Sequence, residues 1–174
     1  MTGPCFVDAN VLIYARDPRD AAKQQRANAW LEHLWREQRG RTSIQVLSEF
    51  YVNQKRLGGS GVAPEELWDR VARYFAWEPY PVDEQLLRSA RQIERRYRLS
   101  WWDSMVVSAA QLQDCTLLLT EDLQDGAVFG GVTVRSPFTL DVREPAATYA
   151  ASLPATSRHR PRGRPRKTPV TSNL

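Results

Sequence analysis

Two apolar runs of this chain end in acidic side chains. Residues 5–7 are followed directly by Asp8, and residues 117–119 are followed closely by Glu121 and Asp122. Both runs are short and apolar, which is typical of buried strands. Ligands of an open parallel sheet bind outside the carboxyl ends of its strands. The acids that follow the two runs are therefore predicted to meet at one edge of a sheet.

Two further acids lie in predicted helices. Asp103 follows Ser100 by three residues, which resembles a capping box and places Asp103 in the first helical turn, near the same edge. Glu49 lies beside the apolar face of another helix. Taken singly, Asp103 could be a capping acid, Glu49 a solvated surface residue and Asp122 a turn residue. The combination of these acids favours a functional site.

A group of carboxylates suits hydrolysis assisted by a divalent metal ion. Mg²⁺ prefers oxygen ligands, and clustered carboxylates repel one another unless a cation neutralises them. A bound metal ion can turn water into a hydroxide nucleophile and stabilise the oxygens of a phosphoryl displacement. Such a reaction needs no nucleophilic Ser, Cys or His. The acids therefore predict metal-dependent hydrolysis of phosphodiester bonds by activated water.

The elements that must position these acids are predicted to alternate along the chain. Strands are expected at 5–7, 116–119 and 132–134, with a short one at 80–82, and helices at 21–37, 43–56, 64–75, 83–97 and 101–112. Strands separated by helices pair in parallel and carry helices on both faces. The expected fold class is α/β, an open parallel sheet in a three-layer sandwich.

The scarcity of cysteine and histidine limits other chemistries. The 174 residues include two cysteines and two histidines. These counts exclude a disulfide framework and disfavour a Cys/His zinc site or a His-based triad. Both cysteines are expected to be reduced core residues of a cytoplasmic protein. No signal peptide is recognised, and no run reaches the ~20 apolar residues that span a bilayer, so no membrane partner is expected.

Charge divides the chain into two parts. The net charge is +4, from 24 basic and 20 acidic residues. Residues 154–174 carry six of the basic residues and no acid, which leaves residues 1–153 with 18 basic groups, all 20 acidic groups and a net charge of −2. We therefore expect a folded domain at residues 1–143, followed by a linker and a disordered basic C-terminal tail at 144–174.

Segments of the folded part resemble PIN-domain ribonucleases. The matching segments are Phe6–Tyr14, Ser48–Tyr51, Ser100–Ala110, Leu118–Gly126 and the closing Val134–Phe138. They occur in the family's order over about residues 4–138. The subgroup they resemble most is the VapC toxins of bacterial toxin–antitoxin pairs. The resemblance implies that residues 1–143 form a PIN-like nuclease domain.

The same resemblance implies a site and its partners. The acids that match the family's catalytic positions are Asp8, Glu49, Asp103 and Asp122. Of these, Asp8, Asp103 and Asp122 are implied to bind Mg²⁺ or Mn²⁺, with Asn10 and Thr120 as polar supports. The implied activity is that of a toxin endoribonuclease acting on RNA. Homodimerisation and inhibition by a small VapB-like antitoxin are implied as well.

One ambiguity concerns the fourth acid. Glu121 and Asp125 flank Asp122, and either could supply the ligand instead. Asp122 is favoured because it matches the family's Thr-x-Asp position.

The basic tail contains a motif of its own. Pro-Arg-Gly-Arg-Pro, at residues 161–165, resembles the core of an AT-hook. Glycine permits a flat, extended backbone there, so that flanking arginines could enter the narrow minor groove of A·T-rich DNA. The residues implied to bind nucleic acid are Arg160, Arg162, Gly163, Arg164, Arg166 and Lys167. The plainer alternative is a tail that contacts any polyanion through counterion release.

Two other functions fit parts of the sequence. A DNA-binding module would act through the tail and carry a degenerate nuclease pocket. A phosphatase would use Asp8 as a covalent nucleophile. Against the phosphatase, the position two residues on is Asn10 and not a second Asp that could act as general acid. The metal-dependent endoribonuclease toxin is the leading hypothesis.

Overall fold

A computed structural model describes residues 3–57 and 61–143, which contain a five-stranded sheet of order β2-β1-β3-β5-β4. The strands are β1 (Cys5–Val7), β2 (Gly40–Arg41), β3 (Leu117–Leu119), β4 (Val128–Phe129) and β5 (Val132–Arg135). β1 pairs in parallel with β2 and β3, and β3 pairs in parallel with β5. β4 pairs antiparallel with β5, so the sheet is mixed and mostly parallel.

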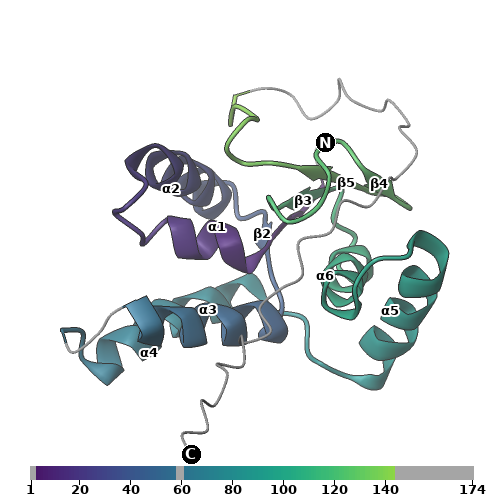
Figure 1. The fold of residues 1–174 in the computed structure, drawn as a ribbon, viewed down its shortest axis with the longest axis horizontal. Helices are drawn as coiled ribbons and strands as arrows, with labels where there is room; N and C mark the ends of the chain where they lie inside the picture. Colours follow the sequence, from purple (N-terminus) through teal and green to yellow (C-terminus); the bar gives the residue numbers. More distant parts are fainter. Residues whose placement is uncertain (1–2, 58–60, 144–174) are drawn as a thin grey trace, which may run out of the picture.

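Helices fill the connections from β1 to β2 and from β2 to β3. They are α1 (Ala9–Tyr14), α2 (Ala21–Arg36), α3 (Ile44–Leu57), α4 (Pro64–Ala72), the 3-10 helix η1 (Arg73–Trp77), α5 (Glu84–Tyr97) and α6 (Trp101–Leu112). Figure 1 shows α1 and α2 to one side of the sheet and α5 and α6 to the other. The α/β class and the placement of helices on both faces are confirmed. No helix within the described ranges is both long and apolar enough to cross a membrane.

Local sequence determines where several helices begin. The side chains of Asp20, Asp83 and Ser100 cap α2, α5 and α6, and each accepts a hydrogen bond from a backbone N–H three residues on. These caps satisfy donors that the first helical turn leaves without a partner. Pro64 opens α4 at a position where its missing N–H costs nothing.

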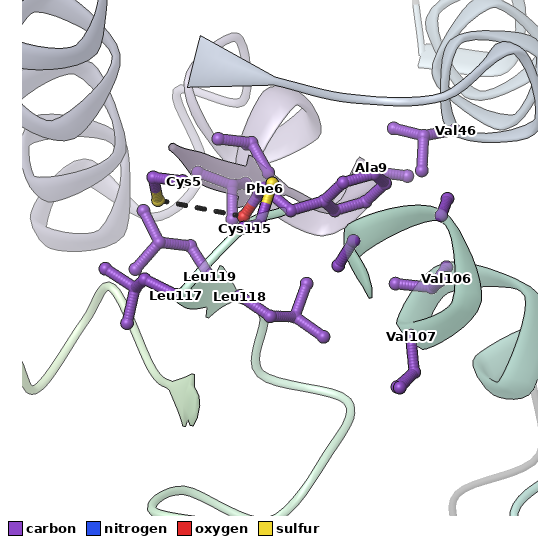
Figure 2. Close-up of a cluster of buried hydrophobic side chains, with 14 of the residues drawn as sticks. Cys5, Phe6, Ala9, Val46, Val106, Val107, Cys115, Leu117, Leu118 and Leu119 are labelled. Carbon is purple, nitrogen blue, oxygen red and sulfur yellow. Dashed lines mark hydrogen bonds between the residues drawn. The ribbon is translucent and has the colours of Figure 1, made fainter. Parts of the chain in front are cut away.

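The core lies between the sheet and its covering helices. All residues of β1 and β3 are buried. Figure 2 shows side chains of these strands gathered with Val46 of α3 and with Val106 and Val107 of α6. The cysteines belong to this core, as the sequence predicts. Burial raises the pKa of the Cys5 thiol well above its usual value and that of Cys115 to about 12.

β2 approaches the rest of the domain closely at Gly40. A Cβ atom on Gly40 would lie 2.4 Å from Cε2 of Trp77. The Trp77 side chain is only 3% exposed, and its ring centroid lies 4.9 Å from that of Trp35 and 5.1 Å from that of Tyr74. Glycine at this position therefore allows β2 to pack on a fixed aromatic cluster.

Some elements differ from the sequence-based expectation. Residues 80–82 do not form a strand, since only an isolated bridge joins Tyr80 to Ser43. β2 and β4 were not predicted, because two residues carry no alternation of polar and apolar side chains. α1 was not predicted either, because six residues are too few for a helical period to be read. The linker and basic tail, residues 144–174, lie outside the described residues.

Candidate active site

Asp8 ends β1 and begins α1. Its Oδ1 accepts a hydrogen bond from the Ala9 backbone N–H at 2.7 Å, which makes it the N-cap of α1. Its Oδ2 accepts from the Thr120 hydroxyl at 2.8 Å. The side chain is 1% exposed. One carboxylate therefore fixes the start of a helix and also joins the ends of two neighbouring strands.

Asn10 links the acids that follow β1 and β3. Its Nδ2 donates to the Thr120 hydroxyl at 2.9 Å and to Asp122 Oδ2 at 3.1 Å, and it lies 3.5 Å from Asp8 Oδ2. The Thr120 hydroxyl also accepts from the Asp122 backbone N–H at 3.1 Å. Asp8 and Asp122, which are separated by more than 100 residues, therefore hydrogen bond to the same amide group.

The strand order explains this meeting. β1 lies between β2 and β3, so the chain leaves β1 toward one side of the sheet and later returns on its other side. A crevice forms where the strand order reverses in this way, outside the carboxyl ends of the strands. Asp8 follows β1, while Thr120 and Asp122 follow β3, so all three lie at this switch point.

Glu49 faces the same crevice from α3. It accepts a hydrogen bond from Nε2 of Gln45 at 3.0 Å, one helical turn earlier. A pocket of about 690 Å³ is lined by Glu49, Asn10 and Asp122 together with side chains from α3, α6 and the segment before α5. The half-buried position of Glu49 differs from that of a freely solvated surface acid.

Asp103 is held at the start of α6. The Ser100 hydroxyl accepts from the Asp103 backbone N–H at 3.1 Å and donates to Asp103 Oδ2 at 2.7 Å. The Asp103 side chain is 2% exposed, which is unusual for a residue that only caps a helix. Its helix neighbours Trp102 and Met105 line the pocket. α6 therefore carries a buried carboxylate to the region where the pocket lies.

The two alternative acids form ion pairs elsewhere. Glu121 pairs with Lys23 of α2 at 2.5 Å, and Asp125 pairs with Arg135 at 3.0 Å. Burial lowers the pKa of Lys23, but hydrogen bonds to Glu121 and Tyr14 more than offset this, so that the pKa is raised. Asp122 is thus the acid of this loop that joins Asn10 and Thr120.

Sequence reasoning missed several side chains around the site. Gln45 and Arg56 line the pocket from α3 with Glu49. Their spacings from Glu49, four and seven residues, are helical and could have indicated a shared face. Trp102 was noted only as part of a motif. The Lys23–Glu121 pair had no signal, because it joins residues 98 positions apart.

The fold and pocket define an α/β domain with acidic side chains at the switch point of a mostly parallel sheet. The model of the PIN domain family matches residues 5–124, and the chain belongs to that family. Among solved structures, it is similar to a toxin–antitoxin complex from Klebsiella pneumoniae, with 18% sequence identity and a TM-score of 0.56. That match covers 76% of this chain and 97% of the other. No curated protein matches the chain significantly.

PIN domains are typically nucleases that use divalent metal ions, and a site for such an ion requires oxygen ligands close together. Among residues 3–57 and 61–143, no three His, Cys, Asp or Glu side chains group closely enough to surround an ion. Mg²⁺ in enzymes is usually held by one or two carboxylates, with waters and substrate phosphate completing its shell. Asp8 and Asp122 meet that smaller requirement. The buried Asn10 Oδ1 has no hydrogen-bond partner among the described residues, so the donor set fits a partly hydrated Mg²⁺.

Proposed function

We propose that this protein is a metal-dependent endoribonuclease of the VapC type, the toxin of a toxin–antitoxin pair. The observation that carries the proposal is the network at the switch point, in which Asn10 bonds both Asp8 and Asp122 beside the pocket that Glu49 lines. The site is made of carboxylates, and the chain has few histidines to activate a nucleophilic side chain. Such a site suits hydrolysis by metal-activated water better than catalysis through a covalent intermediate.

In this proposal Asp8 and Asp122 would bind Mg²⁺ or Mn²⁺. Asp103 would join them as a third ligand only when the ion binds, because no three acids are grouped in the described residues. Glu49 would complete the acidic site. When bound, such an ion would activate water as a Lewis acid and stabilise the phosphodiester oxygens. Asn10 and Thr120 fix the orientation of the two strand-end carboxylates by donating hydrogen bonds to them. Glu121 and Asp125 have supporting positions beside Asp122, where Lys23 and Arg135 neutralise them.

The test is cleavage of RNA by the purified full-length protein with Mg²⁺ and with excess EDTA. Asp8→Asn should abolish cleavage while preserving the fold, because Asn also caps helices well. Asp83→Asn is the matched control, since Asp83 is also an N-cap, whose carboxylate accepts a hydrogen bond from the Leu86 backbone N–H at the start of α5. Cleavage that persists in EDTA, or equal loss of activity in both variants, would refute the proposal.

The toxin role is supported by similarity to the toxin–antitoxin complex from Klebsiella pneumoniae. We propose a homodimer that is inhibited by a small VapB-like antitoxin. Induced expression should arrest growth in a manner that requires Asp8, and the arrest should disappear when the cognate antitoxin is co-expressed. Growth that is unaffected by the wild-type chain at a soluble expression level would oppose this role.

The tail adds a second nucleic-acid contact in the proposal. The AT-hook-like stretch from Arg160 to Lys167 would bind A·T-rich DNA through its arginines. Binding of the full chain to A·T-rich and G·C-rich duplexes, at one salt concentration, tests this assignment. Equal affinity would indicate nonspecific contact with phosphates instead.

A further inference from the structure

The pocket beside the carboxylates has an apolar wall that catalysis by acids does not require. Val52 of α3, Val82 before α5 and Trp102 of α6 line this wall, with exposed fractions of 47%, 50% and 50%. These three side chains come from separate parts of the chain and converge on one pocket. Their exposure leaves apolar surface in water directly next to the proposed catalytic site.

Trp102 is exceptional within its own helix. Every residue from Asp103 to Ala110 is buried, whereas Trp102 remains half exposed at the start of α6. It is the sequence neighbour of the buried Asp103. A tryptophan held on a buried helix is a rigid, flat surface, which is what stacking with a nucleobase requires.

The polar lining of the pocket has unused hydrogen-bonding capacity. Oε1 of Gln45 and Oδ1 of Asn53 are buried and have no hydrogen-bond partner among the described residues. Both side chains line the pocket from α3. Buried amide oxygens normally find a donor. The exocyclic amino group of a base, admitted by a small rotation of either side chain, would supply one.

Charge along α3 suits a nucleic acid. Arg56 lines the pocket seven residues after Glu49, which corresponds to two turns or roughly 10 Å along the helix axis. A polyanion could therefore place one phosphate at the carboxylate end, with its metal ion, and another at Arg56. Val52 of the apolar wall lies between Glu49 and Arg56 along α3, and Val82 and Trp102 line the same pocket.

We propose that this wall is a nucleobase subsite for single-stranded RNA, with Trp102 stacking on the base and Gln45 and Asn53 accepting hydrogen bonds from its edge. The inference rests on the proposed nuclease function and specifies its substrate contact. The subsite selects unpaired RNA, because a base must leave its stack to lie on Trp102. It favours adenine and cytosine over uracil, which lacks an exocyclic amino group.

The test measures binding of short fluorescent RNA oligonucleotides to full-length protein by anisotropy, at one salt concentration. The Asp8→Asn background prevents cleavage during the measurement. Trp102→Ala should weaken binding about tenfold, and Trp102→Phe should retain most of the affinity. Trp68→Ala is the matched control, since Trp68 is 52% exposed on α4 and does not line this pocket.

Three comparisons decide the outcome. Replacing one nucleotide of the oligonucleotide by an abasic one should weaken its binding to the protein that retains Trp102. The same replacement should weaken binding to the Trp102→Ala protein little further. Oligo(A) and oligo(C) should bind more tightly than oligo(U). Equal RNA affinity of the Trp102→Ala and Trp68→Ala proteins would overturn the subsite. The subsite would also be overturned if Trp102→Ala weakened binding of a co-expressed antitoxin but left RNA affinity unchanged.

The same variants separate this inference from the nuclease proposal. Trp102-dependent RNA binding without cleavage in Mg²⁺ would support the subsite and refute the nuclease. Cleavage with the wild-type kcat/KM in the otherwise native Trp102→Ala protein would refute the subsite and leave the nuclease intact.

Discussion

Thr120→Val removes one buried oxygen and changes little in shape. The Thr120 hydroxyl donates to Asp8 and accepts from Asn10 and from the Asp122 backbone, at 2.8, 2.9 and 3.1 Å. The residue is 0% exposed, so water cannot replace the lost partner without entering the core. The substitution therefore leaves the buried Asp8 carboxylate, the buried Asn10 amide and the N–H of the half-buried Asp122 each short of one hydrogen bond.

The loss of stability can be estimated from these contacts. Each buried polar group left without a hydrogen bond costs about 1–3 kcal/mol of folding free energy. The Asn10 amide keeps its carboxylate partners, so it contributes less than the other groups. We expect Thr120→Val to lower the free energy of unfolding by about 3 kcal/mol. For a domain of this size that corresponds to a drop in Tm of about 6–12 °C.

Thermal unfolding followed by circular dichroism measures this effect. Thr133→Val in β5 is the control, because it makes the same chemical change on a half-buried strand residue. We expect the control to change stability by no more than ~0.5 kcal/mol. If Tm falls equally in the two variants, the loss reflects strand packing, and the assignment of the Thr120 hydroxyl as the link between strand ends is wrong.

Three other predictions address the fold. Gly40→Ala forces a Cβ against the buried Trp77 ring and should destabilise the domain by about 1–3 kcal/mol in urea unfolding, whereas Gly131→Ala, with open space at its Cβ position, should be near neutral. The Asp17 carboxyl, which accepts side-chain and backbone hydrogen bonds from Arg19, should titrate by NMR with a pKa of about 2. Because this pKa lies below the unfolded value of 3.8, the associated stability is present above pH 3.8 and is lost as the pH falls through 2; Arg19→Gln should move the pKa back toward 3.8. Burial raises the pKa of both cysteine thiols, so they should react with a thiol reagent at pH 8 only after unfolding, and rapid reaction of the native protein would contradict their placement.

The main elements of the fold could be predicted because their signals are local. The apolar runs at 5–7 and 117–119 read directly as buried strands, and the caps at Asp83 and Ser100 place two helix starts. β2 and β4 could not be predicted in this way, because a two-residue strand is defined by its pairing with a neighbouring strand and not by a pattern in its own sequence. The antiparallel β4 in particular follows from its pairing with β5 and from no pattern of its own.

The site was predictable in part for the same reason. Strand-end acids can be found from sequence, since Asp8 and Asp122 each follow an apolar run. Which acid of residues 121, 122 and 125 joins the network depends on Lys23 and Arg135, which neutralise the other two from other elements. Long-range ion pairs of this kind have no sequence period, so only the structure shows that Glu121 and Asp125 are paired with Lys23 and Arg135. The preference for Asp122 came from its match to the Thr-x-Asp position.

The shortness of the outer strands has a consequence for how copies of the protein can associate. β2 and β4 close the two sides of the sheet, and each contains only two residues. A foreign strand that approached either side would find few backbone groups to pair with, which is one way in which proteins resist edge-to-edge aggregation. Short edge strands therefore disfavour self-association of the described domain through continuation of the sheet.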